Sequence, residues 1–190
     1  MSRIILVRHG HVDWLAPERF RGRAELPLSS LGRRQAQAVA GYIAASWKPE
    51  AVYTSPLGRC RETGAAVAAH LRLEPQPIEG LADIDYGEWQ GLTRQQAKER
   101  WPDETELWFR APHFAVIPGG ETLAAVLSRA TEALWDIMRH HLDGTVARWV
   151  TTALTGCCFS SPWSFRCRAI GTCGRTLAAS MNCSTTTAHS

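Results

Sequence analysis

Short apolar runs alternate with amphipathic segments along the first 147 residues. The runs predict buried strands at residues 4–7, 51–53 and 75–78, and another strand beginning at 145–147. Apolar side chains at helical spacing predict helices over 31–47, 57–71 and 122–142, and a short polar helix over 93–101 that Pro102 stops. Strands that alternate with helices predict an α/β fold, a three-layer sandwich in which helices cover a mostly parallel sheet.

The pattern ends after Ala147. Residues 148–190 mix Ser, Thr, Cys, Gly and Arg, and no stretch of that segment has a clean helical or strand period. The segment holds five of the six cysteines and four arginines but no Asp or Glu. We therefore predict a domain at 1–147, truncated at its C-terminal end, and an aberrant, disordered or irregular tail at 148–190.

Composition excludes several classes of protein. No apolar run approaches the roughly 18 residues that span a membrane, and the first apolar run is too short for a signal peptide. The cysteines form no C-x-x-C pair, so we expect no metal site. The net charge of +3 comes from the tail at residues 148–190. This basic tail either binds a partner or, as we favour, is unrelated in composition to residues 1–147. We expect a cytoplasmic protein without membrane or nucleic-acid partners, and the oligomeric state stays open.

A reactive histidine is the first candidate for chemistry. Arg8, His9 and Gly10 follow the first strand directly, and open parallel sheets bind ligands beyond the carboxyl ends of their strands. Arg8 and Arg59 carry guanidinium groups that fit phosphate oxygens, and a neutral His9 can attack phosphorus through one ring nitrogen. Taken alone, the tripeptide is also compatible with an ordinary loop histidine.

Further motifs follow the R-H-G tripeptide along the chain. After L-V-R-H-G come F-R-G-x-x-x-x-P-L-S-x-x-G (from residue 20), T-S-P-L-x-R (54–59), L-x-D-x-D-Y-G-E-W-Q-G (81–91) and P-G-G-E-T (118–122). This set resembles the histidine phosphatase superfamily, the phosphoglycerate-mutase-like family, and in particular phosphatases similar to the α-ribazole and broad-specificity phosphatases. The resemblance implies a phosphohistidine intermediate, a small phosphorylated metabolite as substrate, and no metal or organic cofactor.

The resemblance also assigns roles. His9 matches the nucleophile, and the phosphate ligands match Arg8, Arg59 and Gly22. The proton donor matches Asp83, one methylene shorter than the glutamate usual there, with Glu88 as the alternative. Glu121 either caps the following helix or contacts the arginine pocket, and we favour capping. Two positions depart from the family pattern: His11 replaces a Glu or Gln, and Leu15 replaces an Asn that contacts phosphate.

A second catalytic histidine is missing. In the family, a late strand ends in a G-H pair whose imidazole stabilises the transferring phosphoryl group, but no histidine occurs between His141 and His189. We reject His140 and His141 as substitutes because they precede the Asp-Gly turn. A permitted back-translation from Arg148 onward reads V-G-H-D-S-V-N-R-V-L-L-L in the displaced frame. We therefore interpret the tail as a frameshift product.

The frameshift has consequences for fold and activity. We expect the sheet to lose a central strand and the helix after it, which weakens the core. The predicted function is a phosphomonoester hydrolase that works through a phosphohistidine and is impaired in this chain. A phosphoglycerate-type mutase and a catalytically inactive phosphate-binding protein are the alternatives.

Overall fold

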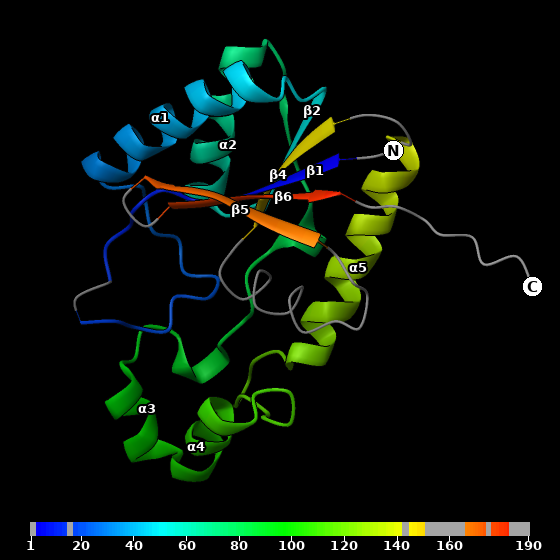
Figure 1. Cartoon of the computed structure of the whole chain (residues 1–190). Coiled ribbons are helices and arrows are strands. Elements are labelled where there is room, and N and C mark those ends of the chain that lie inside the picture. The colour runs from blue at the N-terminus through cyan, green and yellow to red at the C-terminus, as the bar shows by residue number, and fades with distance from the viewer. Residues whose placement is uncertain (1–2, 15–16, 142–144, 151–165, 174–175, 183–190) are drawn as a thin grey trace, which may run out of the picture.

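A six-stranded sheet lies at the centre of the computed structural model, which describes residues 3–14, 17–141, 145–150, 166–173 and 176–182 (Figure 1). The strands are β1 (Arg3–Arg8), β2 (Ala51–Thr54), β3 (Pro75–Pro77), β4 (Thr145–Val150), β5 (Arg166–Cys173) and β6 (Thr176–Asn182). Across the sheet they follow the order β3-β2-β4-β1-β6-β5. The first four strands in this order are parallel, and β6 and β5 are antiparallel to their neighbours, so the expected mostly parallel sheet is confirmed.

Helices cover both faces of the sheet. In Figure 1, α1 (Ser30–Ser46) and α2 (Gly58–Leu71) lie on one face and α5 (Leu123–His140) lies on the other. Side chains of β1 alternate between the two layers, as the pleat of a strand requires. Ile5 and Val7 pack in the core beneath α1 and α2, whereas Ile4 and Leu6 belong to the core beneath α5. The alternation explains why this strand is apolar at every position from 4 to 7.

Side-chain caps fix where three of the helices begin. The hydroxyl of Ser29 accepts a hydrogen bond from the Gly32 amide at the start of α1, and Thr122 caps α5 through the Ala125 amide. A reciprocal capping box of Thr93 and Gln96 begins α3 (Arg94–Arg100). These starts agree with the predicted helices to within one residue.

One helix was not predicted. The short helix α3 does end before Pro102, but Pro102 then begins a second helix, α4 (Pro102–Arg110). Proline is favoured at the first helical position because its missing N–H would have no partner there. Two single-turn helices, η1 (Glu79–Leu81) and η2 (Gly87–Trp89), lie on either side of the segment that carries Asp83.

The C-terminal segment departs from expectation. The predicted loss of a central strand is wrong, because β4 continues past Ala147 to Val150 and lies between β1 and β2. Strands β5 and β6 form a hairpin on the free edge of β1, where the sequence pattern predicted no regular element. Backbone N–H and C=O groups form these ladders irrespective of side-chain periodicity. The helix expected after β4 falls on residues outside the described ranges.

Within the described ranges, no helix combines the length and the apolar character that crossing a bilayer requires.

Candidate active site

The carboxyl end of β1 delivers His9 to the edge of the sheet. The next residue, Gly10, donates its amide to the hydroxyl of Thr63 on α2 over 3.3 Å, and that hydroxyl donates to the Arg59 carbonyl over 2.8 Å. A Cβ on Gly10 would lie 2.3 Å from the Gly32 carbonyl oxygen of α1, so only glycine fits here. The loop after β1 is thus held between the first turn of α1 and the second turn of α2.

His9 is a buried, neutral histidine with a defined tautomer. The Nδ1 atom of its imidazole lies 2.7 Å from the Gly10 carbonyl oxygen. Because a carbonyl only accepts, Nδ1 carries the proton and Nε2 keeps its lone pair. Burial lowers the pKa of His9 to about 3, and the charges of Arg59, Arg8 and Arg21 contribute to the lowering. A neutral imidazole with an available nitrogen among three cations is suited to attack an anionic phosphorus centre.

Arg59 is completely buried, and most of its guanidinium is held by protein groups. One terminal nitrogen donates to the Ala24 carbonyl at 2.8 Å, and the other donates to the Gly22 carbonyl at 2.7 Å and pairs with Asp83 at 3.2 Å. Its Nε has no hydrogen-bond partner among the described residues. Three fixed contacts therefore orient the group and leave its Nε N–H for a ligand.

A second unpaired donor belongs to Arg21. Its Nη1 is buried and, within the part of the chain that the structure describes, bonds to nothing. Burial and the neighbouring Arg21 charge also lower the pKa of the Arg8 guanidinium. Buried N–H groups without partners are rare in folded proteins, because each costs about 1–3 kcal/mol of desolvation. Guanidinium N–H groups of this kind suit the oxygens of an anion such as phosphate.

The two candidate proton donors differ in burial. Asp83 is 8% exposed; its Oδ1 accepts the Ile84 amide at 3.0 Å, and its Oδ2 faces Arg59. Glu88 lies exposed on the turn of η2, where its backbone amide bonds to the Pro118 carbonyl. The geometry thus brings Asp83, and not Glu88, into contact with the arginines around His9.

Gly22 has a structural role in this pocket. Its φ is +47°, a left-handed conformation, and a Cβ there would lie 2.8 Å from the Ile84 carbonyl oxygen. Its own carbonyl accepts from Arg59. The F-R-G motif therefore orients Arg59 and brings Arg21 into the pocket, a role that the sequence had not assigned to Arg21.

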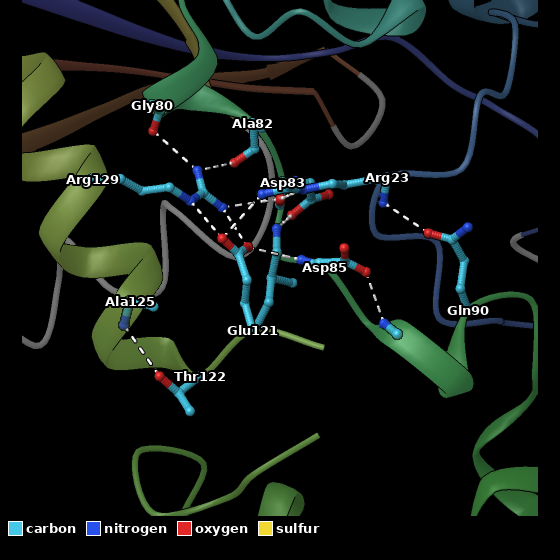
Figure 2. Close-up of polar contacts among 12 residues, drawn as sticks. Arg23, Gly80, Ala82, Asp83, Asp85, Gln90, Glu121, Thr122, Ala125 and Arg129 are labelled. Atoms are coloured by element: carbon cyan, nitrogen blue, oxygen red, sulfur yellow. Dashed lines mark hydrogen bonds and ion pairs between the residues drawn. The ribbon is translucent and has the colours of Figure 1, made fainter. Parts of the chain in front are cut away.

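The preferred role of Glu121 was wrong. Thr122, and not Glu121, caps α5, and the Glu121 carboxylate instead contacts Arg23, Arg129 and the Asp85 amide (Figure 2). These arginines are neither Arg8 nor Arg59, so the contacts of Glu121 do not match the alternative role in the arginine pocket either.

His141 and His11 bond to other groups. His141 ends α5, where Nε2 accepts from the Tyr53 hydroxyl at 2.8 Å and Nδ1 faces Glu50 at 2.8 Å. His11 bonds to Ser29 through Nδ1, and Leu15 lies outside the described residues. No group of His, Cys, Asp and Glu side chains suited to a metal ion occurs in the described ranges.

Comparison with known proteins identifies the family. The profile of the histidine phosphatase superfamily (branch 1) matches residues 4–176. Phosphoserine phosphatase 1 of Hydrogenobacter thermophilus is 31% identical over 175 residues, which cover 88% of this chain and 82% of that protein.

Solved structures agree with that match. Bacillus stearothermophilus YhfR superposes with a TM-score of 0.79 at 25% identity, over 90% of this chain and 93% of that one. A mycobacterial glucosyl-3-phosphoglycerate phosphatase superposes with a TM-score of 0.74 at 25% identity, over 82% and 76% of the two chains. The chain belongs to the histidine phosphatase superfamily, branch 1, and with it to the phosphoric monoester hydrolases.

Proposed function

We propose that this chain hydrolyses small phosphomonoesters through a phosphohistidine formed on His9. The single observation that carries the proposal is the neutral, buried His9, whose Nδ1 proton is committed to the Gly10 carbonyl while two unpaired arginine donors lie in the same pocket. The names of relatives, a phosphoserine phosphatase and a glucosyl-3-phosphoglycerate phosphatase, support a small phosphorylated metabolite as the substrate.

The reaction proceeds in two transfers. Nε2 of His9 attacks phosphorus, an N–P bond forms, and the bond from phosphorus to the ester oxygen breaks. The leaving oxygen takes a proton from the Asp83 carboxyl group, which enters this step protonated. Water then attacks the phosphohistidine and gives its proton to the Asp83 carboxylate, which releases phosphate and neutral His9. Throughout, Arg8, Arg21 and Arg59 hold the phosphoryl oxygens.

Labelling with a phospho-donor tests the intermediate. A substrate with radioactive phosphorus should leave an acid-labile, alkali-stable label on His9, and His9→Ala should abolish it. His70→Ala, which changes an exposed histidine on α2, is the control that should keep the label. Binding of vanadate without label or phosphate release would instead identify an inactive phosphate-binding protein. Transfer of the phosphoryl group to a second hydroxyl of the substrate would identify a mutase.

We further propose that activity is impaired because the tail is read out of frame. In the displaced frame the histidine codon spans the codons of Val150 and Thr151. Val150 is the register partner of Arg8, the residue before His9, so a histidine at this point of β4 would lie beside the nucleophile. This agreement between codon position and strand register supports the frameshift interpretation.

Restoring the frame tests the impairment. A chain whose frame is restored after Ala147 should hydrolyse a panel of phosphomonoesters about 10²–10³ times faster than this chain, because one preorganised donor contributes about that factor. Replacing the regained histidine by alanine should remove the gain. Equal turnover by the two chains, or a DNA sequence with no family-like frame beside the tail, would refute the frameshift interpretation.

A further inference from the structure

Three charged side chains contact the backbone around Asp83 (Figure 2). Arg23 comes from the loop before α1, Glu121 from the turn before α5, and Arg129 from α5 itself. We call these three residues the carboxylate brace. They meet at the segment 80–85, which begins in η1 and leads to Asp85.

Arg129 binds three successive parts of this segment. Its Nη1 donates to the Gly80 carbonyl at 3.1 Å and to the Ala82 carbonyl at 2.8 Å, and its Nη2 donates to the Asp83 carbonyl at 3.1 Å. One planar guanidinium therefore holds the carbonyls on both sides of the Asp83 nitrogen and Cα. Its geometry is rigid, so the contacts fix the direction of the backbone as well as its position.

Glu121 holds the arginines and the far end of the segment. Oε1 accepts from Arg129 Nε and from Arg23 Nη2, each at 3.0 Å, and Oε2 accepts from Arg129 Nη2 at 2.8 Å and from the Asp85 amide at 3.0 Å. Burial alone would raise the pKa of Glu121, but the hydrogen bonds from Arg129 and the Asp85 amide, with the charges of both arginines, lower it. The carboxylate is therefore charged at neutral pH.

The Asp83 carbonyl is the point where the brace converges. It accepts from Arg23 Nε at 3.3 Å as well as from Arg129. On the opposite side, the carboxyl group of the same residue faces Arg59 in the phosphate pocket. The brace thus binds the main chain of Asp83, while its carboxyl group accepts hydrogen bonds from Arg59 and the Ile84 amide.

We propose that Arg23, Glu121 and Arg129 are positioning residues that hold Asp83 so that its carboxyl group reaches the leaving oxygen of the substrate. This inference rests on the proposed function, in which Asp83 protonates that oxygen. A general acid acts only within hydrogen-bond reach, and a displacement of about 1 Å costs about 10²-fold in rate. An aspartate has one methylene fewer than a glutamate, so the placement of its backbone determines its reach.

Two classes of substrate separate positioning from stability. An alkyl phosphate such as β-glycerol phosphate releases an alkoxide that requires a proton, whereas p-nitrophenyl phosphate releases a phenolate that does not. Glu121→Gln and Arg129→Met should lower kcat/KM for the alkyl phosphate about 10- to 100-fold, and for p-nitrophenyl phosphate by less than about threefold. Asp83→Asn should show the same selectivity with a larger loss, because general acids contribute about 10²–10⁴-fold.

The chain offers a matched control on the same helix. Asp136 and Arg139 form an exposed ion pair one turn apart on α5, with side chains 60% and 71% exposed. Asp136→Asn removes the same type of carboxylate–guanidinium contact and should change neither rate. Arg129→Lys keeps the charge but has three N–H donors in place of the five contacts that Arg129 makes with the carbonyls and Glu121, so its selectivity should lie between those of wild type and Arg129→Met.

All variants are assayed in this chain and in the chain with the restored frame, with folding checked by circular dichroism. Equal losses for both substrates, or a loss in folded protein that Asp136→Asn reproduces, would overturn the positioning role while leaving the proposed function intact. If wild type and His9→Ala hydrolyse both substrates equally poorly in both backgrounds, the proposed function fails and the inference fails with it.

Discussion

The depressed pKa of His9 makes acid stability a direct test of the pocket. Between the unfolded pKa of 6.5 and the folded pKa of about 3, the unfolded chain binds one proton more than the folded chain at this residue. Stability from neutral His9 is therefore complete above pH 6.5 and is lost as the pH falls toward 3. Burial is the main cause, with Arg59, Arg8 and Arg21 adding to it, and Asp83 is the carboxylate paired with Arg59.

The size of the effect follows from the two pKa values. Each pH unit within this window changes the free energy of unfolding by about 1.4 kcal/mol. Going from pH 7.5 to 4.5, His9 should remove about 2.5 kcal/mol of stability. Total stability is about 5–15 kcal/mol for a typical domain, so the change is easily measured.

Urea unfolding of wild type and His9→Asn at the two pH values provides the measurement. The difference between the two proteins should change by about 2.5 kcal/mol in favour of the variant at pH 4.5. Thr63→Val, which alters the same pocket without a titrating group, should shift stability equally at both pH values. A His9→Asn difference that is constant within about 0.5 kcal/mol would refute the neutral, buried His9 and with it the nucleophile's electrostatic basis.

Three further outcomes follow from single contacts. Burial raises the pKa of the Cys60 thiol to about 12, so peptide mapping after alkylation at pH 8 should find Cys60 unmodified in folded protein and modified in urea. Tyr53→Phe removes the hydrogen bond to His141 and should lower the free energy of unfolding in urea by about 1 kcal/mol. Gly10→Ala places a methyl group against the Gly32 carbonyl and should destabilise the fold by more than about 1 kcal/mol in the same assay.

The sequence predicted those helices and strands that are determined by residues close to one another along the chain. The runs at β1 and β2 and the starts of α1 and α5 depend on residues within one or two turns, and the structure confirms them, although Thr122 and not Glu121 caps α5. The helix α4 was missed because Pro102 ends one helix and begins another, and a proline alone does not reveal the second event. The β5–β6 hairpin was missed because its backbone pairing leaves no periodic side-chain pattern.

Some residues of the site were predicted from sequence motifs, whereas others are recognised only in the folded structure. Motif order predicted His9, Arg59 and Asp83, and the structure brings these three together. The brace was missed because Arg129 meets Gly80, Ala82 and Asp83 across 46 to 49 positions of sequence, a separation that no local pattern reports. Arg21 stood in a recognised motif, but only its unpaired Nη1 in the folded pocket marks it as a ligand for an anion.

In this chain we expect phosphate binding to be kept while the catalytic rate is low. Arg59 is oriented by protein carbonyls and Asp83, and His9 by Gly10, so neither depends on a residue after Val150 for its place. Phosphate recognition is therefore built from residues that precede the segment we interpret as frameshifted, although the family profile itself matches as far as residue 176. Formation and hydrolysis of the phosphohistidine both transfer a negatively charged phosphoryl group. A histidine at the end of β4 would stabilise the charge on its oxygens in both transition states. Without that histidine, formation and hydrolysis of the phosphohistidine should both be slow, while affinity for inorganic phosphate, a ground-state ligand, should change far less than turnover.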